Sequence, residues 1–133
     1  MSDNYINVAS PSYPSTRMRR NRKTNWSRRL IEENRFSVND LILPIFITDG
    51  DKKTVVNSMP GVYRTPITQI IETVQEAKEL GIPAIALFPE TNTALKDEQG
   101  TEALNDKNLV CRATNLIKKN INDIGIITDV ALD

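Results

Sequence analysis

The sequence contains no histidine and a single cysteine, Cys111. Histidine-based catalytic triads and histidine-ligated metals are therefore excluded from these 133 residues, and no internal disulfide can form. The five glycines are scattered singly, so the chain also lacks a glycine-rich loop for binding phosphate. With one thiol and no secretory leader in view, we expect the protein to be located in the reducing cytoplasm.

Long apolar runs are missing as well, because no stretch approaches the roughly 20 residues that a membrane span requires. Aromatic residues make up 5% of the chain, and its single tryptophan, Trp26, lies among arginines. Many proteins bind single-stranded nucleic acid by stacking bases on several aromatic side chains, and one tryptophan is weak evidence for such binding. The sequence therefore predicts neither a membrane nor a nucleic acid as the partner.

The net charge of zero is a cancellation between two regions. Residues 1–35 hold eight Lys or Arg and three acids, whereas residues 36–133 hold nine Lys or Arg and fourteen acids. An asymmetry of this kind indicates two parts with different roles. We expect residues 1–35 to form a basic N-terminal arm that lies on an acidic surface, either of its own body or of a neighbouring copy, and residues 36–133 to form that body.

Three short apolar runs in the body are typical of strands that are covered on both faces. They span residues 41–47, 84–88 and 125–132. Helical spacing predicts one helix between each pair of strands. The first is expected to begin with Thr65 as its N-cap and to end at Gly81, and the second has Leu109 and Ile117 on its apolar face. A further short helix is expected over 26–34 in the arm.

Strands that alternate with helices favour a parallel α/β sheet with right-handed crossovers. Both an open doubly wound sheet and a (β/α)8 barrel fit this order. The segments after the first two strands are long and those returning from helix to strand are short, which is how a barrel builds its site at one end. The barrel is therefore favoured, with three of its eight strands in this chain.

The third predicted strand carries the candidate site residues, Asp129 and Asp133. Alternation places both side chains on one face, at or near the carboxyl end of a parallel strand, where barrel enzymes keep catalytic groups. Four residues of strand span roughly 13 Å, so the two acids cannot share one proton. They could instead hold opposite ends of a ligand or different cations. The alternative is structural: Asp129 pairs with a basic side chain on another strand, and Asp133 opens a turn.

Five motifs resemble one known family in both order and spacing. They are Asp40–Phe46, Ser58–Arg64, Gly81–Pro89, Lys96–Gly100 and Thr128–Asp133. Together with the arginine-rich segment at 17–22, they are similar to the porphobilinogen synthases, also called delta-aminolevulinic acid dehydratases. The resemblance covers about residues 17–133. It implies a (β/α)8 TIM barrel with an extended N-terminal arm, of which residues 36–133 form the N-terminal portion.

The resemblance also implies an activity, the condensation of two 5-aminolevulinate molecules to porphobilinogen in haem biosynthesis. The substrate ketones form Schiff bases with two lysines of later strands, which this chain does not contain, so the chain alone is expected to be inactive. Asp129 matches the family's active-site aspartate near the second substrate. Asp133 takes the place of a zinc ligand and is expected to face the ammonium group of that substrate.

Cofactors and partners are implied in the same way. Zinc-dependent relatives carry cysteines at the positions of Ala131 and Asp133, so no active-site zinc is expected here. The pattern resembles the magnesium-responsive branch, with the magnesium sites outside this chain. In the family the arm wraps a neighbouring subunit and dimers assemble into octamers or smaller forms, which implies a homo-oligomer, with an octamer expected for the full-length protein. The competing hypothesis is a non-enzymatic interaction module that uses its arginine-rich arm to bind nucleic acid or another partner.

Overall fold

The structure is a computed structural model that describes residues 12–17 and 19–129. The chain divides into two compact units, Met1–Phe36 and Ser37–Asp133. The helices of the described part are short, and none of them is long and apolar enough to cross a membrane.

The first unit holds the 3-10 turn η1 (Arg20–Arg22) and the helix α1 (Asn25–Leu30). The predicted helix over 26–34 is therefore too long, since α1 ends at Leu30. Its expected apolar face does not pack, because Trp26 is 66% exposed and Leu30 is 77% exposed. None of the described residues of this unit is buried. A helix of six residues without a core gains little from packing, which explains why it stops early.

The second unit is built on a five-stranded sheet in the order β2-β3-β1-β4-β5. Its strands are β1 (Ile42–Thr48), β2 (Thr54–Val55), β3 (Tyr63–Pro66), β4 (Ala84–Pro89) and β5 (Gly125–Thr128). β1 pairs in parallel with both β3 and β4, β4 pairs in parallel with β5, and β2 runs antiparallel to β3. The order strand, helix, strand, helix, strand predicted for β1, β4 and β5 is thus confirmed.

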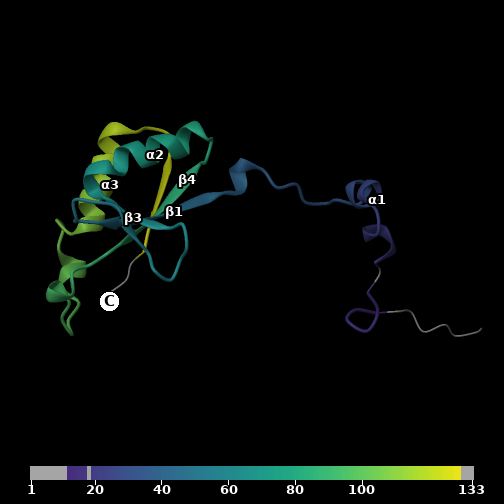
Figure 1. Ribbon diagram of the computed structural model, residues 1–133, viewed down its shortest axis with the longest axis horizontal. Coiled ribbons are helices and arrows are strands. Elements are labelled where there is room, and N and C mark those ends of the chain that lie inside the picture. Colours follow the sequence, from purple (N-terminus) through teal and green to yellow (C-terminus); the bar gives the residue numbers. More distant parts are fainter. Residues whose placement is uncertain (1–11, 18, 130–133) are drawn as a thin grey trace, which may run out of the picture. The chain divides into compact units, whose positions relative to one another are not determined.

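Two helices, α2 (Ile70–Glu79) and α3 (Leu109–Asn120), cover one face of this sheet (Figure 1). Their apolar stripes meet side chains of β1 and β4 in a single core. Its fully buried members include Ile47, Ile70, Val74, Ile85, Leu87, Ala113 and Ile117. Short 3-10 turns complete the unit, at η2 (Val38–Asp40), η3 (Ile67–Gln69), η4 (Thr93–Leu95) and η5 (Thr101–Leu104).

The start of α2 differs from the prediction. Thr65 and Pro66 are the last residues of β3, and the regular helix begins only at Ile70. Thr65 pairs in register with Ile47 and is 5% exposed, so its side chain is buried against the sheet and does not cap a helix. The expected end of the helix is confirmed, because Gly81 has a φ of 80°, in the left-handed region that favours glycine.

The hairpin formed by β2 and β3 was not predicted, because both strands are very short and the chain between them reads as a turn. The strand predicted over 125–132 is confirmed over Gly125–Thr128, which form β5, and its continuation over 130–132 lies outside the described residues.

Candidate functional site

The two faces of the sheet differ in what covers them. Ile45, Ile47, Ile85 and Leu87 point toward α2 and α3 and are buried in the core. Alternation places Phe46, Phe88 and Ile127 on the opposite face, which we call the open face. Phe88 is 37% exposed and Ile127 is 46% exposed, so this face is only partly covered by the described residues. In a barrel it would become the interior.

One row of side chains crosses the open face near the carboxyl ends of the strands. Arg64 of β3 pairs in register with Phe46 of β1, which pairs with Phe88 of β4. The two phenylalanine rings lie with their centroids 5.5 Å apart. On the far side of β4, Thr128 is in register with Leu87, so the next residue, Asp129, continues the row beside Phe88. The row therefore reads arginine, two aromatic rings, aspartate.

Asp129 directly follows β5 and is exposed. Ile126 packs against the core on the helix-covered face, and Asp129, three residues later, has the opposite parity. It thus lies on the open face, at the carboxyl edge of a parallel strand. Its catalytic role stays a prediction. Asp133, the other predicted site residue, lies outside the described residues, so its place beside Asp129 also stays a prediction.

An ion pair between Arg64 and Glu90 lies at the same edge and was missed in the sequence. The Nε of Arg64 is 2.9 Å from Oε1 of Glu90, and the two side chains are 31% and 46% exposed. Glu90 immediately follows β4, and its N–H donates to the carbonyl of Ile47 at 2.8 Å, so it continues the parallel ladder. Its position two residues after Phe88, on the same face, was the signal that could have revealed it.

A second ion pair joins the end of β1 to α3. Nη2 of Arg112 donates to both carboxylate oxygens of Asp49 at 2.6 Å, and its Nε donates to the carbonyl of Lys107 at 3.0 Å. Asp49 follows β1 directly, at the edge where the candidate site lies. This guanidinium therefore fixes the segment that leaves β1 to the helix that precedes β5.

The long segment after β4 is ordered by local hydrogen bonds. Oδ1 of Asp97 accepts from the backbone N–H of Thr101 at 2.8 Å, and Oδ1 of Asn92 accepts from the N–H of Ala94 at 3.0 Å. The hydrogen bond from the Thr101 side chain, followed by that from the Thr101 backbone, lowers the pKa of Asp97 below its ordinary value. Both contacts are internal to the segment and bring no group to the row on the open face.

Within residues 12–17 and 19–129, no three Asp, Glu, His or Cys side chains come together as a metal site would require. The only cysteine, Cys111, is half-buried at the start of α3 and forms no disulfide. Its backbone N–H is held by Oδ1 of Asn108, which caps α3 at 2.8 Å. The described residues therefore supply no cage for either zinc or magnesium.

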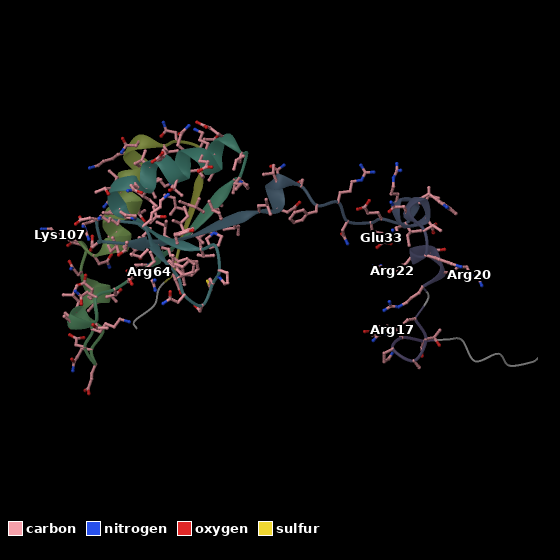
Figure 2. All side chains as sticks on the ribbon, in the orientation of Figure 1. Arg17, Arg20, Arg22, Glu33, Arg64 and Lys107 are labelled. Atoms are coloured by element: carbon pink, nitrogen blue, oxygen red, sulfur yellow. The ribbon has the colours of Figure 1, made fainter. Side chains whose placement is uncertain are left out.

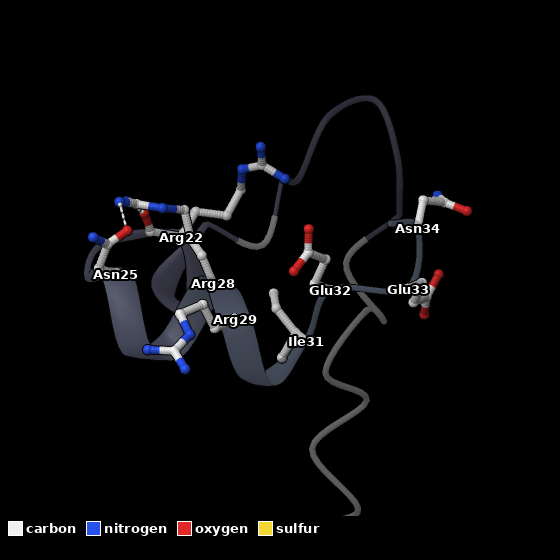
Figure 3. A pocket seen from close by; sticks show the side chains of 8 residues that line it. All are labelled: Arg22, Asn25, Arg28, Arg29, Ile31, Glu32, Glu33 and Asn34. Atoms are coloured by element: carbon white, nitrogen blue, oxygen red, sulfur yellow. Dashed lines mark hydrogen bonds between the residues drawn. The ribbon is translucent and has the colours of Figure 1, made fainter. Parts of the chain in front are cut away.

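A separate pocket lies within the first unit (Figure 3). Its lining residues are Arg22, Asn25, Arg28, Arg29, Ile31, Glu32, Glu33 and Asn34. Arg28 is already occupied, since it donates to the carbonyl of Arg22 at 2.8 Å and to Oδ1 of Asn25 at 2.9 Å. All the lining side chains are exposed, and basic and acidic groups are mixed, so this pocket has no marks of a catalytic site.

Comparison with known proteins shows which family this chain resembles. The family model described as "Delta-aminolevulinic acid dehydratase" matches residues 15–133. A delta-aminolevulinic acid dehydratase of Bradyrhizobium diazoefficiens is 48% identical over 128 residues, covering 95% of this chain and 36% of the relative. One from Synechocystis is 43% identical over 124 residues, covering 90% of this chain and 36% of the relative.

Among solved structures, the delta-aminolevulinic acid dehydratase of Toxoplasma gondii in complex with porphobilinogen is similar, with a TM-score of 0.77 and 36% identity. The match covers 88% of this chain and 33% of that one. The chain thus spans about a third of the length of these relatives. The sheet of the second unit corresponds to part of a TIM barrel, as the sequence predicted. The chain belongs to the delta-aminolevulinic acid dehydratase family.

Proposed function

We propose that the protein of which this chain forms the N-terminal part of the barrel is a porphobilinogen synthase, a lyase that condenses two molecules of 5-aminolevulinate to porphobilinogen in tetrapyrrole biosynthesis. The observation that carries the proposal is the position of Asp129 on the open face, at the carboxyl edge of β5. Catalytic groups of barrel enzymes lie at this edge of the strands. The two Schiff-base lysines belong to strands outside residues 1–133.

The row on the open face suits one part of this chemistry. The carboxylate of Asp129 attracts the ammonium group of a substrate molecule, and the rings of Phe46 and Phe88 beside it provide an apolar floor for the substrate's carbon chain. Excluding water from such a site strengthens the attraction between carboxylate and ammonium, because the local dielectric falls. Asp129 thereby orients the substrate, and the lysines supply the covalent chemistry.

Asp133 is proposed to face the same ammonium group from a position further along the chain. Magnesium is proposed as the metal of the whole protein, held outside this chain, because carboxylate-rich sites prefer such hard cations. The described residues do not form a metal site, so we derive no catalytic step through a metal. A thiolate zinc site at the third strand is not proposed, since residue 131 is alanine and residue 133 is aspartate.

We propose further that the first unit is an arm for homo-oligomer formation, with an octamer as the expected assembly, in the cytoplasm. None of its described residues is buried, so it gains its stability from a partner surface. Its charge is opposite to that of residues 36–133, which favours a neighbouring copy as that partner. Binding of nucleic acid is less well supported, because Trp26 is the only aromatic residue of α1.

A chimera tests the enzymatic proposal. Residues 1–133 are joined to the remaining C-terminal part of the Bradyrhizobium relative, and the purified protein is given 5-aminolevulinate. We expect porphobilinogen to form, and Asp129→Asn to lower kcat by roughly 100-fold, as the loss of a group that holds the reacting substrate does.

Asp123→Asn is the matched control, since Asp123 undergoes the same chemical change at the opposite end of β5. Its φ of 63° is tolerated by asparagine, so folding and activity should be unchanged. A chimera that folds as an oligomer but makes no porphobilinogen would contradict the proposal. Equal activity of the Asp129→Asn protein and the control would remove Asp129 from the site.

A further inference from the structure

We propose that Arg64 is a positioning residue, which acts through Glu90 to hold the β2–β3 hairpin as one wall beside Phe46 and Phe88. The inference rests on the proposed function, because the wall matters for catalysis only if the open face binds substrate. The hairpin, residues 54–66, runs from the start of β2 to the end of β3. Arg64 lies in its second strand and is labelled in Figure 2.

The geometry of the guanidinium carries the proposal. Its Nε contacts Oε1 of Glu90 at 2.9 Å, and its Nη1 donates to the carbonyl of Val55 at 3.3 Å. Val55 belongs to β2 and Glu90 follows β4, and in the sheet order β1 lies between β3 and β4. One side chain therefore joins three segments of the sheet and bridges the carboxyl end of the central strand.

The hairpin needs this bridge because its other attachments are few. β2 has two residues and pairs only with β3, and β3 pairs with β1 over the three positions that begin at Phe46. Inside the hairpin, Val56 is 8% exposed and its N–H donates to the carbonyl of Val62 at 2.9 Å, which makes the loop compact. The hairpin is thus well ordered internally but held to the sheet by a short contact, and Arg64 adds a second one.

Stability alone is a poor explanation for the pair. Both side chains are partly exposed, and ion pairs of this kind contribute little to the free energy of unfolding. Their effect is geometric, since the planar fork of an arginine fixes the direction of each partner. A lysine keeps the charge but offers a single nitrogen, which cannot reproduce the Nε and Nη1 contacts together.

The test uses the chimera described above and two independent measurements. In Arg64→Lys and in Glu90→Ala, amide hydrogens of residues 54–62 should exchange at least about fivefold faster, as expected for a segment that opens more often. KM for 5-aminolevulinate should rise by roughly fivefold with a smaller change in kcat, because the wall affects binding more than the covalent steps. The double variant should match the single ones, since the two residues act as one unit.

Glu79→Ala is the matched control. Glu79 accepts from Nε2 of Gln75 at 2.9 Å on α2, so the same truncation removes an exposed contact on the other face of the sheet. It should leave exchange and KM unchanged. Exchange of residues 54–62 within twofold of the parent in both variants, or effects that add in the double variant, would overturn the positioning role. A parent chimera without activity would contradict only the proposed function. The hydrogen-exchange measurement would still decide whether Arg64 holds the hairpin.

Discussion

At the scale of single residues, Asp97 shows how local hydrogen bonds shift the pKa of an exposed carboxyl group. Thr101 lowers the pKa of Asp97, first through its side chain and then through its backbone N–H. The pKa of Asp97 is lower in the folded than in the unfolded chain. Its ionised carboxylate therefore stabilises the fold at pH values above the ordinary pKa of 3.8. This contribution is lost as the pH falls through the lowered folded pKa.

A substitution of Thr101 checks this assignment. Thr101→Val removes the hydroxyl and should raise the pKa of Asp97 toward its ordinary value, whereas Thr101→Ser keeps the donor and should leave the pKa low. The measurement is a titration of the Asp97 side-chain carbon by NMR in the chimera. Identical titration of the valine and serine variants would show that the hydroxyl has no part in the shift.

The position of Asp129 in the fold, unlike the pKa of Asp97, could be predicted from the sequence. Its place on the open face followed from the period of two along a strand, and the structure reproduces that parity. Glu90 obeys the same period but was not identified, because it follows Pro89, where the apolar run had already ended. Its partner Arg64 lies 26 residues earlier in the chain, and no local pattern shows a contact of that range.

At the scale of elements, Arg112 connects the end of β1 to α3 through Asp49 and through the carbonyl of Lys107. Arg112→Lys should lose most of this geometry and lower the free energy of unfolding by about 0.2–1 kcal/mol, the range for exposed pairs. Urea unfolding of the chimera measures the change, and 1 M salt should reduce it because exposed charges are screened.

Arg29→Lys serves as the control for that experiment. Arg29 is an exposed arginine of α1 in the first unit, so the same exchange should leave the urea midpoint unchanged. A shift equal to that of the Arg112 variant would mean that arginine content in general, and not the contact with Asp49, determines the stability. A midpoint that is unchanged in the Arg112 variant would remove the pair from the interactions that hold α3.

The helices and strands that have a clear periodic pattern of apolar residues could be predicted from the sequence. The stripes of α2 and α3 and the apolar runs of β1 and β4 depend on burial, which alternation and helical spacing report directly. The predicted start of α2 at Thr65 and Pro66 is wrong. Both residue types are common at helix starts, but here the two residues pair with β1 and form the end of β3. The β2–β3 hairpin was missed for the same reason, since its short strands are held by partners that are distant in sequence.

At the scale of the whole molecule, the open face and the outer edge of β5 govern how the 133-residue chain behaves by itself. Ile42 is 54% exposed, Phe88 37% and Ile127 46%, and among the described residues β5 pairs only with β4. Exposed apolar side chains beside an unpaired strand edge favour association. We expect the isolated chain to form oligomers or aggregates and to make no porphobilinogen.

Light scattering after size-exclusion chromatography, together with an assay for porphobilinogen, checks this expectation. The chimera is the comparison, because it supplies the strands that the family likeness places next to β5. A monodisperse monomer with a sharp, cooperative unfolding transition would contradict the expected association. Turnover of 5-aminolevulinate by the isolated chain would contradict the assignment of the lysines to later strands.

The central position of β1 has a consequence for synthesis on the ribosome. Both neighbours of β1 in the sheet, β3 and β4, lie within the first 89 residues, so its hydrogen-bonding partners have all been translated before α3 emerges. Chains generally begin to fold from the N-terminal side during translation. Among the described residues, the sheet can therefore grow outward from its middle strand, with β3 and β4 joining before β5 has been made.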